Sequence, residues 1–312
     1  MGFRLSAILV AGPCRARAQR VVAALSAQTA LLSIEIIVVD LVAESVPRLT
    51  AGEGATLVYV PMPGLARWGK ARAEGARVAR APIVAFIEDH CFPEPDWADY
   101  VIDAHRGPWA AVGYAFTNAN PESHMSRTGL LARYGMFVHP AAGGAARFIA
   151  GNNVSYKRDL ILEAGTQLDT LLDIDFNMQE DLIRRGHHLF VEARALAAHL
   201  NYNTLFGECQ TGRPYCRLLA SHRAQVNAWG IPRRILYGVL TPLSAPVIRL
   251  ARLARSLRGR HVLWSTAITG LPSIAVMYLS DALGESAGYL FGPGNAARDV
   301  LKYELETERG SG

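Results

Sequence analysis

Cysteine is scarce in this sequence, and the paired cysteines that structural zinc sites require are missing. Only four occur in 312 residues, Cys14, Cys91, Cys209 and Cys216, and no two form a C-x-x-C pair. No secretory signal precedes them, so we expect reduced thiols in a cytosolic compartment. Cys209 and Cys216 are expected to be ordinary side chains rather than metal ligands.

The sequence also lacks the two common motifs of glycine-rich, phosphate-binding loops. The apolar run Leu5–Val10 continues into AGPCRARAQ, which lacks the G-x-G-x-x-G of dinucleotide-binding folds, and no G-x-x-x-x-G-K-[ST] motif is present. A Rossmann dehydrogenase and a P-loop enzyme are therefore poor fits. If the chain binds a nucleoside diphosphate, another device, such as a divalent metal, must neutralise the phosphates.

Acidic residues are absent from residues 209–280, which contain ten arginines and no lysine. The whole chain has a net charge of +5, so this stretch carries +10 and the remainder 5 − 10 = −5. Because the basic residues are confined to one apolar segment without a nucleic-acid-binding module, we do not expect a nucleic-acid partner. An anionic membrane surface is the better match.

β-rich apolar runs alternate with helical patterns in the first half of the chain. This alternation is typical of an α/β domain with a mostly parallel sheet flanked by helices. The chain length allows one such domain, residues 1–205, followed by an extension, residues 206–312. The predicted strands are Leu5–Val10, Ile34–Val39, Thr56–Val60 and Ile83–Ile87, with helices at Arg15–Ser26 and Trp68–Arg80.

Titratable residues directly follow two of these strands. Asp40 follows IEIIVV, and Glu88, Asp89 and His90 follow PIVAFI. Ligands of open α/β sheets bind beyond the carboxyl ends of the strands, so these residues are site candidates. Asp40 alone fits a solvated strand end equally well.

Glu88 and His90 are candidate metal ligands. Two residues apart on an extended chain, they point to the same side and can reach one cation, while Asp89 points elsewhere and could hydrogen-bond a ribose or another sugar. A carboxylate with an imidazole suits Mn²⁺, and Mg²⁺ is the alternative.

Four motifs follow one another in an order that resembles the family 2 glycosyltransferases. They are ILVAGPCR (8–15), IIVVD (36–40), GKARAEG (69–75) and AFIEDHCFPEPDW (85–97). The resemblance covers roughly the first two hundred residues and implies a GT-A-type fold with a helical C-terminal extension. The sequence departs from the family pattern at Ala11, Cys14 and Ala73, and Glu88 and His90 replace both acids of D-x-D.

The resemblance implies roles for residues of the donor site. Asp40 corresponds to the acid that reads the nucleobase, Arg72 to the arginine near the donor diphosphate, and Glu88 and His90 to the metal motif. The segment FIAGNNVSYKRD (148–159) resembles the donor-sugar pocket, with Asn152 and Asn153 as its binding residues. The same asparagines would equally make a Gly-Asn turn.

The resemblance also points to a base and a third metal ligand. In LLDIDFNMQEDLIRRGHHL (171–189), counting back from Gly186 aligns Asp175 with the catalytic acid of the family pattern. Asp173 is the second candidate. Asp181 lies too close to Gly186 and is expected to pair with nearby arginines. His199 follows a strand-like segment where related enzymes carry a histidine that contacts the metal or the diphosphate, and Asn201 is a weaker candidate.

These parts imply an inverting transferase of the hexosyltransferase type. The metal and Arg72 would stabilise charge on the departing nucleoside diphosphate while Asp175 takes a proton from an acceptor hydroxyl. The acceptor would be a carbohydrate or a lipid-linked sugar in cell-envelope synthesis. The alternatives are a sugar-nucleotide-binding module that has lost catalysis and a membrane scaffold.

The remaining segments predict an acceptor loop and a membrane element. Residues 116–147 resemble a flexible loop on the acceptor side. Val247–Leu257 predicts an amphipathic helix in a headgroup layer, with Val247, Leu250, Ala254 and Leu257 on its apolar side. Residues 261–280 carry no formal charge, and they favour an element embedded in the membrane or its interface over a true span. We expect the protein at the cytoplasmic face of the membrane.

Overall fold

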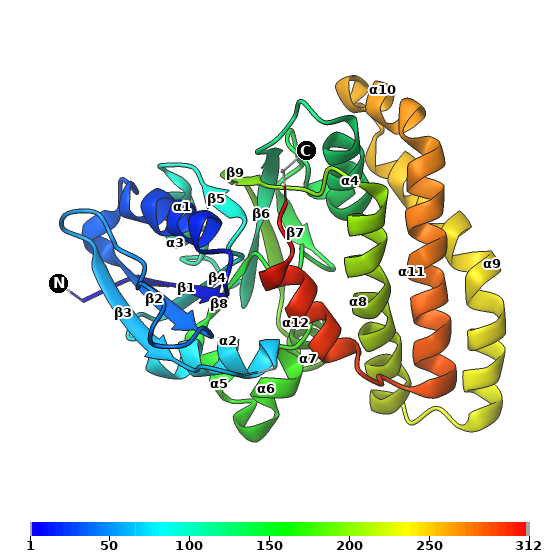
Figure 1. Cartoon of the computed structure of the whole chain (residues 1–312), viewed down its shortest axis with the longest axis horizontal. Coiled ribbons are helices and arrows are strands. Elements are labelled where there is room, and N and C mark those ends of the chain that lie inside the picture. The colour runs from blue at the N-terminus through cyan, green and yellow to red at the C-terminus, as the bar shows by residue number, and fades with distance from the viewer. Residues whose placement is uncertain (1, 66, 310–312) are drawn as a thin grey trace. The chain divides into compact units, whose positions relative to one another are not determined.

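A computed structural model describes residues 2–65 and 67–309, which form two compact units (Figure 1). The first unit contains the chain up to residue 117 together with residues 139–199. The second contains residues 118–138 and the chain from residue 200 onward. The sequence predicted one boundary, after residue 205. Residues 310–312, at the end of the predicted extension, lie outside the described residues.

The first unit is built on a mixed sheet with the strand order β3-β2-β1-β4-β8-β6-β9-β5, and β7 pairs with β9. Strands β3, β2, β1 and β4 pair in parallel, whereas β8 is antiparallel to β4 and β6, and β5 is antiparallel to β9. The predicted α/β class is confirmed. The strands are β1 (Leu5–Ala11), β2 (Ile34–Asp40), β3 (Thr56–Pro61), β4 (Ile83–Ile87), β5 (Cys91–Pro93), β6 (Ala111–Asn118), β7 (Gly144–Ala146), β8 (Val154–Lys157) and β9 (Leu189–His199).

Helices cover both faces of this sheet. Figure 1 shows α1 and α3 on one face and α2, α5 and α6 on the other. The predicted helix Arg15–Ser26 is confirmed as α1, and Gly186, at φ +86°, follows the end of α7 as the sequence predicted. The helices of this unit are α1 (Arg15–Ser26), α2 (Trp68–Val78), α3 (Trp97–Ala104), α5 (Arg158–Leu162), α6 (Leu168–Leu171) and α7 (Asp175–Arg184), with short 3₁₀ helices at Leu31–Ser33 and Gly165–Gln167.

The second unit is helical, as the sequence predicted for the C-terminal region. Helices α8, α9 and α11 lie side by side, and α12 packs on α8 (Figure 1). The helices are α4 (His124–Tyr134), α8 (Leu205–Val226), α9 (Ile231–Ser256), α10 (His261–Thr269), α11 (Leu271–Phe291) and α12 (Ala296–Glu306), with a 3₁₀ helix, η2, at Gly135–Phe137.

Helix α4 lies within the segment 116–147, for which the sequence predicted a flexible loop. The amide N–H of Ser126 donates to Ser123 Oγ at 3.2 Å, which caps the first turn. On the inner face of the helix, Leu130 and Leu131 are buried. A capping serine and buried leucines therefore order a segment whose polar composition suggested mobility.

Helix α9 runs through two prolines, Pro242 and Pro246. Pro242 has no N–H for the carbonyl of Gly238, one turn earlier. The hydroxyl of Ser286 in α11 donates to that carbonyl instead, at 2.6 Å. A partner from a neighbouring helix thus replaces the lost hydrogen bond, and the helix continues.

A buried histidine beside α3 predicts a pH dependence of stability. Burial, and then the charge of Lys157, lowers the pKa of His105 from 6.5 to about 3. Between these two pKa values the unfolded chain binds a proton at this histidine and the folded protein does not. The free energy of unfolding therefore decreases as the pH decreases. We expect this histidine to remove up to about 1.4 kcal/mol of unfolding free energy per pH unit below about pH 6.

Urea unfolding at pH 7, 6 and 5 measures this slope. His105→Gln, which can still bond Ser155, should flatten it, whereas His188→Gln at an exposed position should not. Equal slopes in the parental protein and His105→Gln would contradict the assignment.

Candidate metal and donor site

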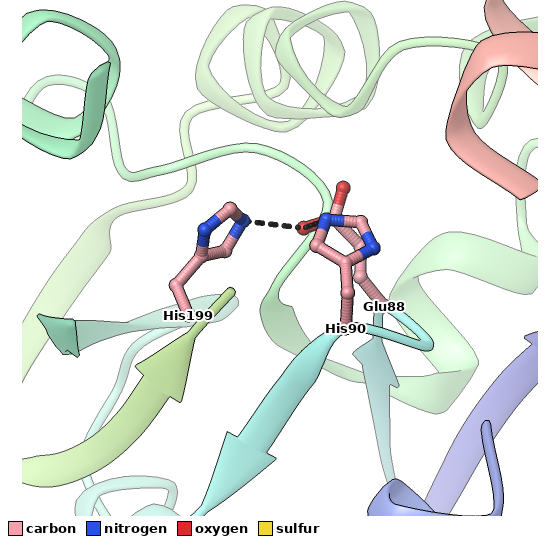
Figure 2. A group of neighbouring side chains, drawn as sticks. All are labelled: Glu88, His90 and His199. Atoms are coloured by element: carbon pink, nitrogen blue, oxygen red, sulfur yellow. Dashed lines mark ion pairs between the residues drawn. The ribbon is translucent and has the colours of Figure 1, made fainter. Parts of the chain in front are cut away.

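Three buried side chains of the first unit converge in an arrangement that could hold a metal ion. Glu88, His90 and His199 each offer a ligand atom, and these atoms lie within 4.8 Å of one another. Nε2 of His90 and Nε2 of His199 are each 3.5 Å from Glu88 Oε2 (Figure 2). One carboxylate and two imidazoles suit a borderline divalent ion such as Mn²⁺.

The convergence arises from a turn and not from the extended chain that the sequence argument assumed. The N–H of Cys91 donates to the Glu88 carbonyl at 3.1 Å, which closes a turn between β4 and β5. Cys91 is the register partner of His199 in the antiparallel β5/β9 pair, so the end of β9 lies beside this turn. The two imidazole rings meet edge to face, with centroids 4.9 Å apart.

Two asparagines orient the Glu88 carboxylate. Nδ2 of Asn152 donates to Oε1 at 2.7 Å and Nδ2 of Asn153 donates to Oε2 at 2.5 Å, while the Glu88 N–H donates to Asn153 Oδ1 at 2.9 Å. The sequence predicted both asparagines as donor-binding residues. Asn153 is fully buried, so it acts on Glu88 instead.

Asn152 connects this carboxylate with a second buried acid. Its φ of +69° lies in the left-handed region, which asparagine tolerates better than most residues. In this conformation its N–H donates to Asp175 Oδ2 at 2.6 Å, and its carbonyl accepts from Arg72 Nη2 at 2.6 Å. Asn152 therefore links the Glu88 carboxylate to the Asp175–Arg72 pair.

Asp175 is the first residue of α7, and its side chain does not reach solvent. It is completely buried and forms an ion pair with Arg72, which is itself 1 % exposed. Tyr156 Oη donates to Asp175 Oδ1 at 3.1 Å. Burial, and then the Asp175 charge, raises the pKa of Tyr156 well above its usual value, so the phenol remains protonated.

Asp89 is not available for a sugar in the way that the sequence predicted. Its carboxylate accepts from Arg17 Nε at 2.9 Å and lies 2.9 Å from His90 Nδ1. With Nδ1 as the donor, Nε2 of His90 carries the lone pair that a metal needs. Asp89 thus positions a candidate ligand.

Asp40 ends β2 at the carboxyl edge of the sheet, where the sequence placed it. Both of its oxygens accept from the Arg15 guanidinium, at 2.9 and 3.0 Å. Sequence reasoning missed Arg15, Arg17 and Tyr156. The two arginines had a signal, because they lie in the segment that directly follows β1.

Two other acids of 171–189, Asp173 and Asp181, bind to arginines of the first unit. Asp173 accepts from Arg67 Nη2 at 2.7 Å and from the Gly69 N–H at 3.0 Å. Asp181 pairs with Arg184 and Arg185 at 3.5 and 3.2 Å, which confirms the predicted surface pairing. Asn201 belongs to the second unit, where its Nδ2 donates to Asn118 Oδ1 at 3.1 Å.

Cys91 lies next to the metal-ligand cluster but is not suited to join it. Burial, and then the Glu88 charge, raises the pKa of its thiol well above the usual value. Because a metal ligand must be the thiolate, Cys91 remains a packing residue.

Comparison with known proteins supports the fold. No protein-family model and no curated protein matches the chain. Among solved structures, the mannosyltransferase PcManGT from Pyrobaculum calidifontis, in complex with GDP-Man and Mn²⁺, is similar with a TM-score of 0.54 and 15 % identity over 91 % of this chain and 86 % of that one. TarS 1–349 of S. aureus is similar with a TM-score of 0.48 and 13 % identity, over 92 % and 90 % of the two chains. The chain therefore has a glycosyltransferase fold.

Proposed function

We propose that the first unit transfers a sugar from a nucleoside diphosphate donor to an acceptor hydroxyl, with inversion at the anomeric carbon. The observation that carries this proposal is the Glu88, His90 and His199 cluster at the carboxyl ends of strands. It occurs in a fold shared with a mannosyltransferase whose structure contains GDP-Man and Mn²⁺. The finer assignments, a family 2 enzyme and a hexosyl donor, belong to the same proposal.

The residues around the cluster fit a divalent metal, Mn²⁺ or Mg²⁺. Such an ion, when bound, would stabilise the negative charge of the departing nucleoside diphosphate. Asn152 and Asn153 hold both oxygens of Glu88, and Asp89 fixes the ring of His90. These contacts preorganise the ligands and reduce the ordering that metal binding requires.

The proposed base, Asp175, needs an oxygen that can accept the proton of the acceptor. Arg72 and the Asn152 N–H both engage Oδ2. Since a guanidinium binds diphosphate oxygens well, donor binding gives Arg72 an alternative partner. We infer that Arg72 turns toward the donor and leaves Asp175 Oδ2 to the acceptor hydroxyl. Asp40 would bind the nucleobase beside Arg15.

A second candidate is a binding module that holds the sugar nucleotide without turnover. Its support is the complete engagement of Asp175 by Arg72, Asn152 and Tyr156. For the active enzyme we propose a carbohydrate or lipid-linked acceptor in cell-envelope synthesis, at the cytoplasmic face of the membrane. The arginine-rich second unit supports the membrane location.

Thermal stability with a panel of nucleotide sugars tests the proposal. At a hundredfold excess over Kd, a bound ligand adds about 2.7 kcal/mol, which is roughly 4 °C in Tm for a protein of this size. We expect such a shift with one donor, and only with Mn²⁺ or Mg²⁺ present. NMR of the product should show an inverted anomeric configuration. No shift with any nucleotide sugar overturns both candidates, whereas a shift without turnover on a set of glycan and lipid-linked acceptors supports the binding module.

A further inference from the structure

An apolar stripe runs along the outward side of α9 in the second unit. Its members recur at intervals of three and four residues and are 49–75 % exposed: Leu236, Val239, Leu240, Leu243 and Val247. The opposite side of α9 packs on α11, and two α9 residues on that side, Gly238 and Thr241, are buried. A Cβ on Gly238 would lie 2.5 Å from Leu290, so α9 is held closely on that side. The helix thus has two apolar sides, and only one of them is covered.

Arginines flank the stripe at both ends. Arg233 lies before it, and Arg252, Arg255 and Arg258 follow it, all of them exposed. No acidic residue occurs in α9. The stripe spans twelve residues, which are eleven helical steps and about 16 Å along the axis. An apolar band between cationic ends is typical of a helix that lies in the headgroup layer of a bilayer.

This surface differs from the one that the sequence predicted over Val247–Leu257. Leu257 is fully buried, in an apolar cluster with Leu131 and Ile274. Arg249 also points inward, where it pairs with Asp281 at 2.6 Å and with Glu285. The outward apolar surface therefore begins about three turns earlier than the sequence predicted.

The uncharged stretch that the sequence predicted as a membrane element does not form one straight helix. Among the residues that it describes, no single helix is long and apolar enough to span a bilayer. Helices α10 and α11 meet these criteria only together, and the pair is bent by 75° at Gly270. The uncharged stretch 261–280, predicted as one element, is thus divided between two helices.

We propose that α9 docks the protein on an anionic bilayer, with the stripe toward the acyl chains and the four exposed arginines at lipid phosphates. The charges on α9 favour an anionic bilayer over a second copy of the chain as the partner of this stripe. Both ends of the stripe are cationic and no acid lies on α9, so a copy would bring like charges together in either orientation. Anionic lipids complement all four arginines.

Co-sedimentation of the full chain with vesicles tests the docking surface. We expect binding to 3:1 phosphatidylcholine:phosphatidylglycerol vesicles at low salt and much weaker binding to pure phosphatidylcholine. The double variant Leu243→Asp, Val247→Asp should bind about 100-fold more weakly, because two side chains no longer enter the apolar layer. The double variant Leu32→Asp, Val78→Asp is the matched control, since it adds the same two charges in the first unit, where Leu32 is 87 % and Val78 42 % exposed.

Two charge-matched double variants distinguish vesicle binding through the arginines of α9 from binding through the overall positive charge of the chain. Arg252→Ser with Arg255→Ser should lower binding to anionic vesicles by at least about 10-fold. Arg106→Ser with Arg184→Ser, at exposed positions of the first unit, removes the same charge and should have little effect. Leu243→Trp should show a blue-shifted emission with vesicles that Leu32→Trp does not show.

Three results would overturn the proposal. They are a parental protein that stays in solution with anionic vesicles, a Leu243→Asp, Val247→Asp variant that still sediments normally, and a soluble dimer that only this variant dissociates. The last result would assign the stripe to a second copy. Because the assay contains neither donor nor metal, failure of the proposed transferase activity would not affect it.

Discussion

Replacing His199 with Gln is expected to weaken Mn²⁺ binding by at least about 100-fold. Loss of a residue that merely orients a metal ligand costs about 10- to 100-fold in affinity, so loss of a direct ligand should cost more. His199 is one of three ligand side chains and stands at the end of β9. Metal-dependent donor binding should disappear with it. Isothermal titration with Mn²⁺, alone and with the stabilising donor, measures both effects.

Two further variants distinguish ligation from general damage to the fold. His188→Gln changes an exposed histidine just before the same strand and should leave metal affinity unchanged. Asn153→Ala removes an amide that orients Glu88 and should give an intermediate loss, about 10- to 100-fold. Parental Mn²⁺ affinity in folded His199→Gln would refute the assignment of the metal site.

Asp175→Asn should lower kcat by about 10²- to 10⁴-fold while donor and metal affinity remain. The amide keeps the shape of the side chain but cannot take the proton of the acceptor. Asp181→Asn, which loses only surface contacts with Arg184 and Arg185, should keep the parental kcat. Steady-state rates with the donor identified in the panel measure this difference.

The buried ion pair adds a second effect to the Asp175 variant. Removing one partner leaves the Arg72 guanidinium uncompensated in the interior, which typically costs about 3–5 kcal/mol of stability. Rates must therefore be compared per folded, donor-binding protein. A purely structural role would lower donor binding and turnover together, whereas a base lowers kcat alone. A parental kcat in folded Asp175→Asn, or its loss in Asp181→Asn only, would reject Asp175 as the base.

Local sequence pattern determined the α/β class and the approximate position of the site. The runs Leu5–Val10, Ile34–Val39 and Ile83–Ile87 are strands because they are mostly apolar, rich in β-forming residues and bounded by turns. Acids that follow such runs must lie at the carboxyl edge of a parallel sheet. Asp40 and Glu88 could therefore be placed without knowledge of the tertiary structure.

The partners of these acids could not be found in this way. Asp89 binds Arg17, Glu88 binds Asn152 and Asn153, and Asp175 binds Arg72, across sequence separations of 64 to 103 residues. Such contacts depend on strand order and on antiparallel register, and periodicity contains neither. The turn after β4 and the pairing of β5 with β9 decide that His90 meets His199.

The sequence by itself determined that apolar runs and arginines share the C-terminal region, since both are matters of composition. Only the tertiary structure decided which residues face outward. A helix with apolar residues on two sides gives the same pattern whichever side is packed, and the packing of Gly238 on Leu290 of α11 selects one of them. Leu257 is buried against Leu131 and Ile274 while Leu243 is exposed, although both are leucines in the same apolar, arginine-rich segment.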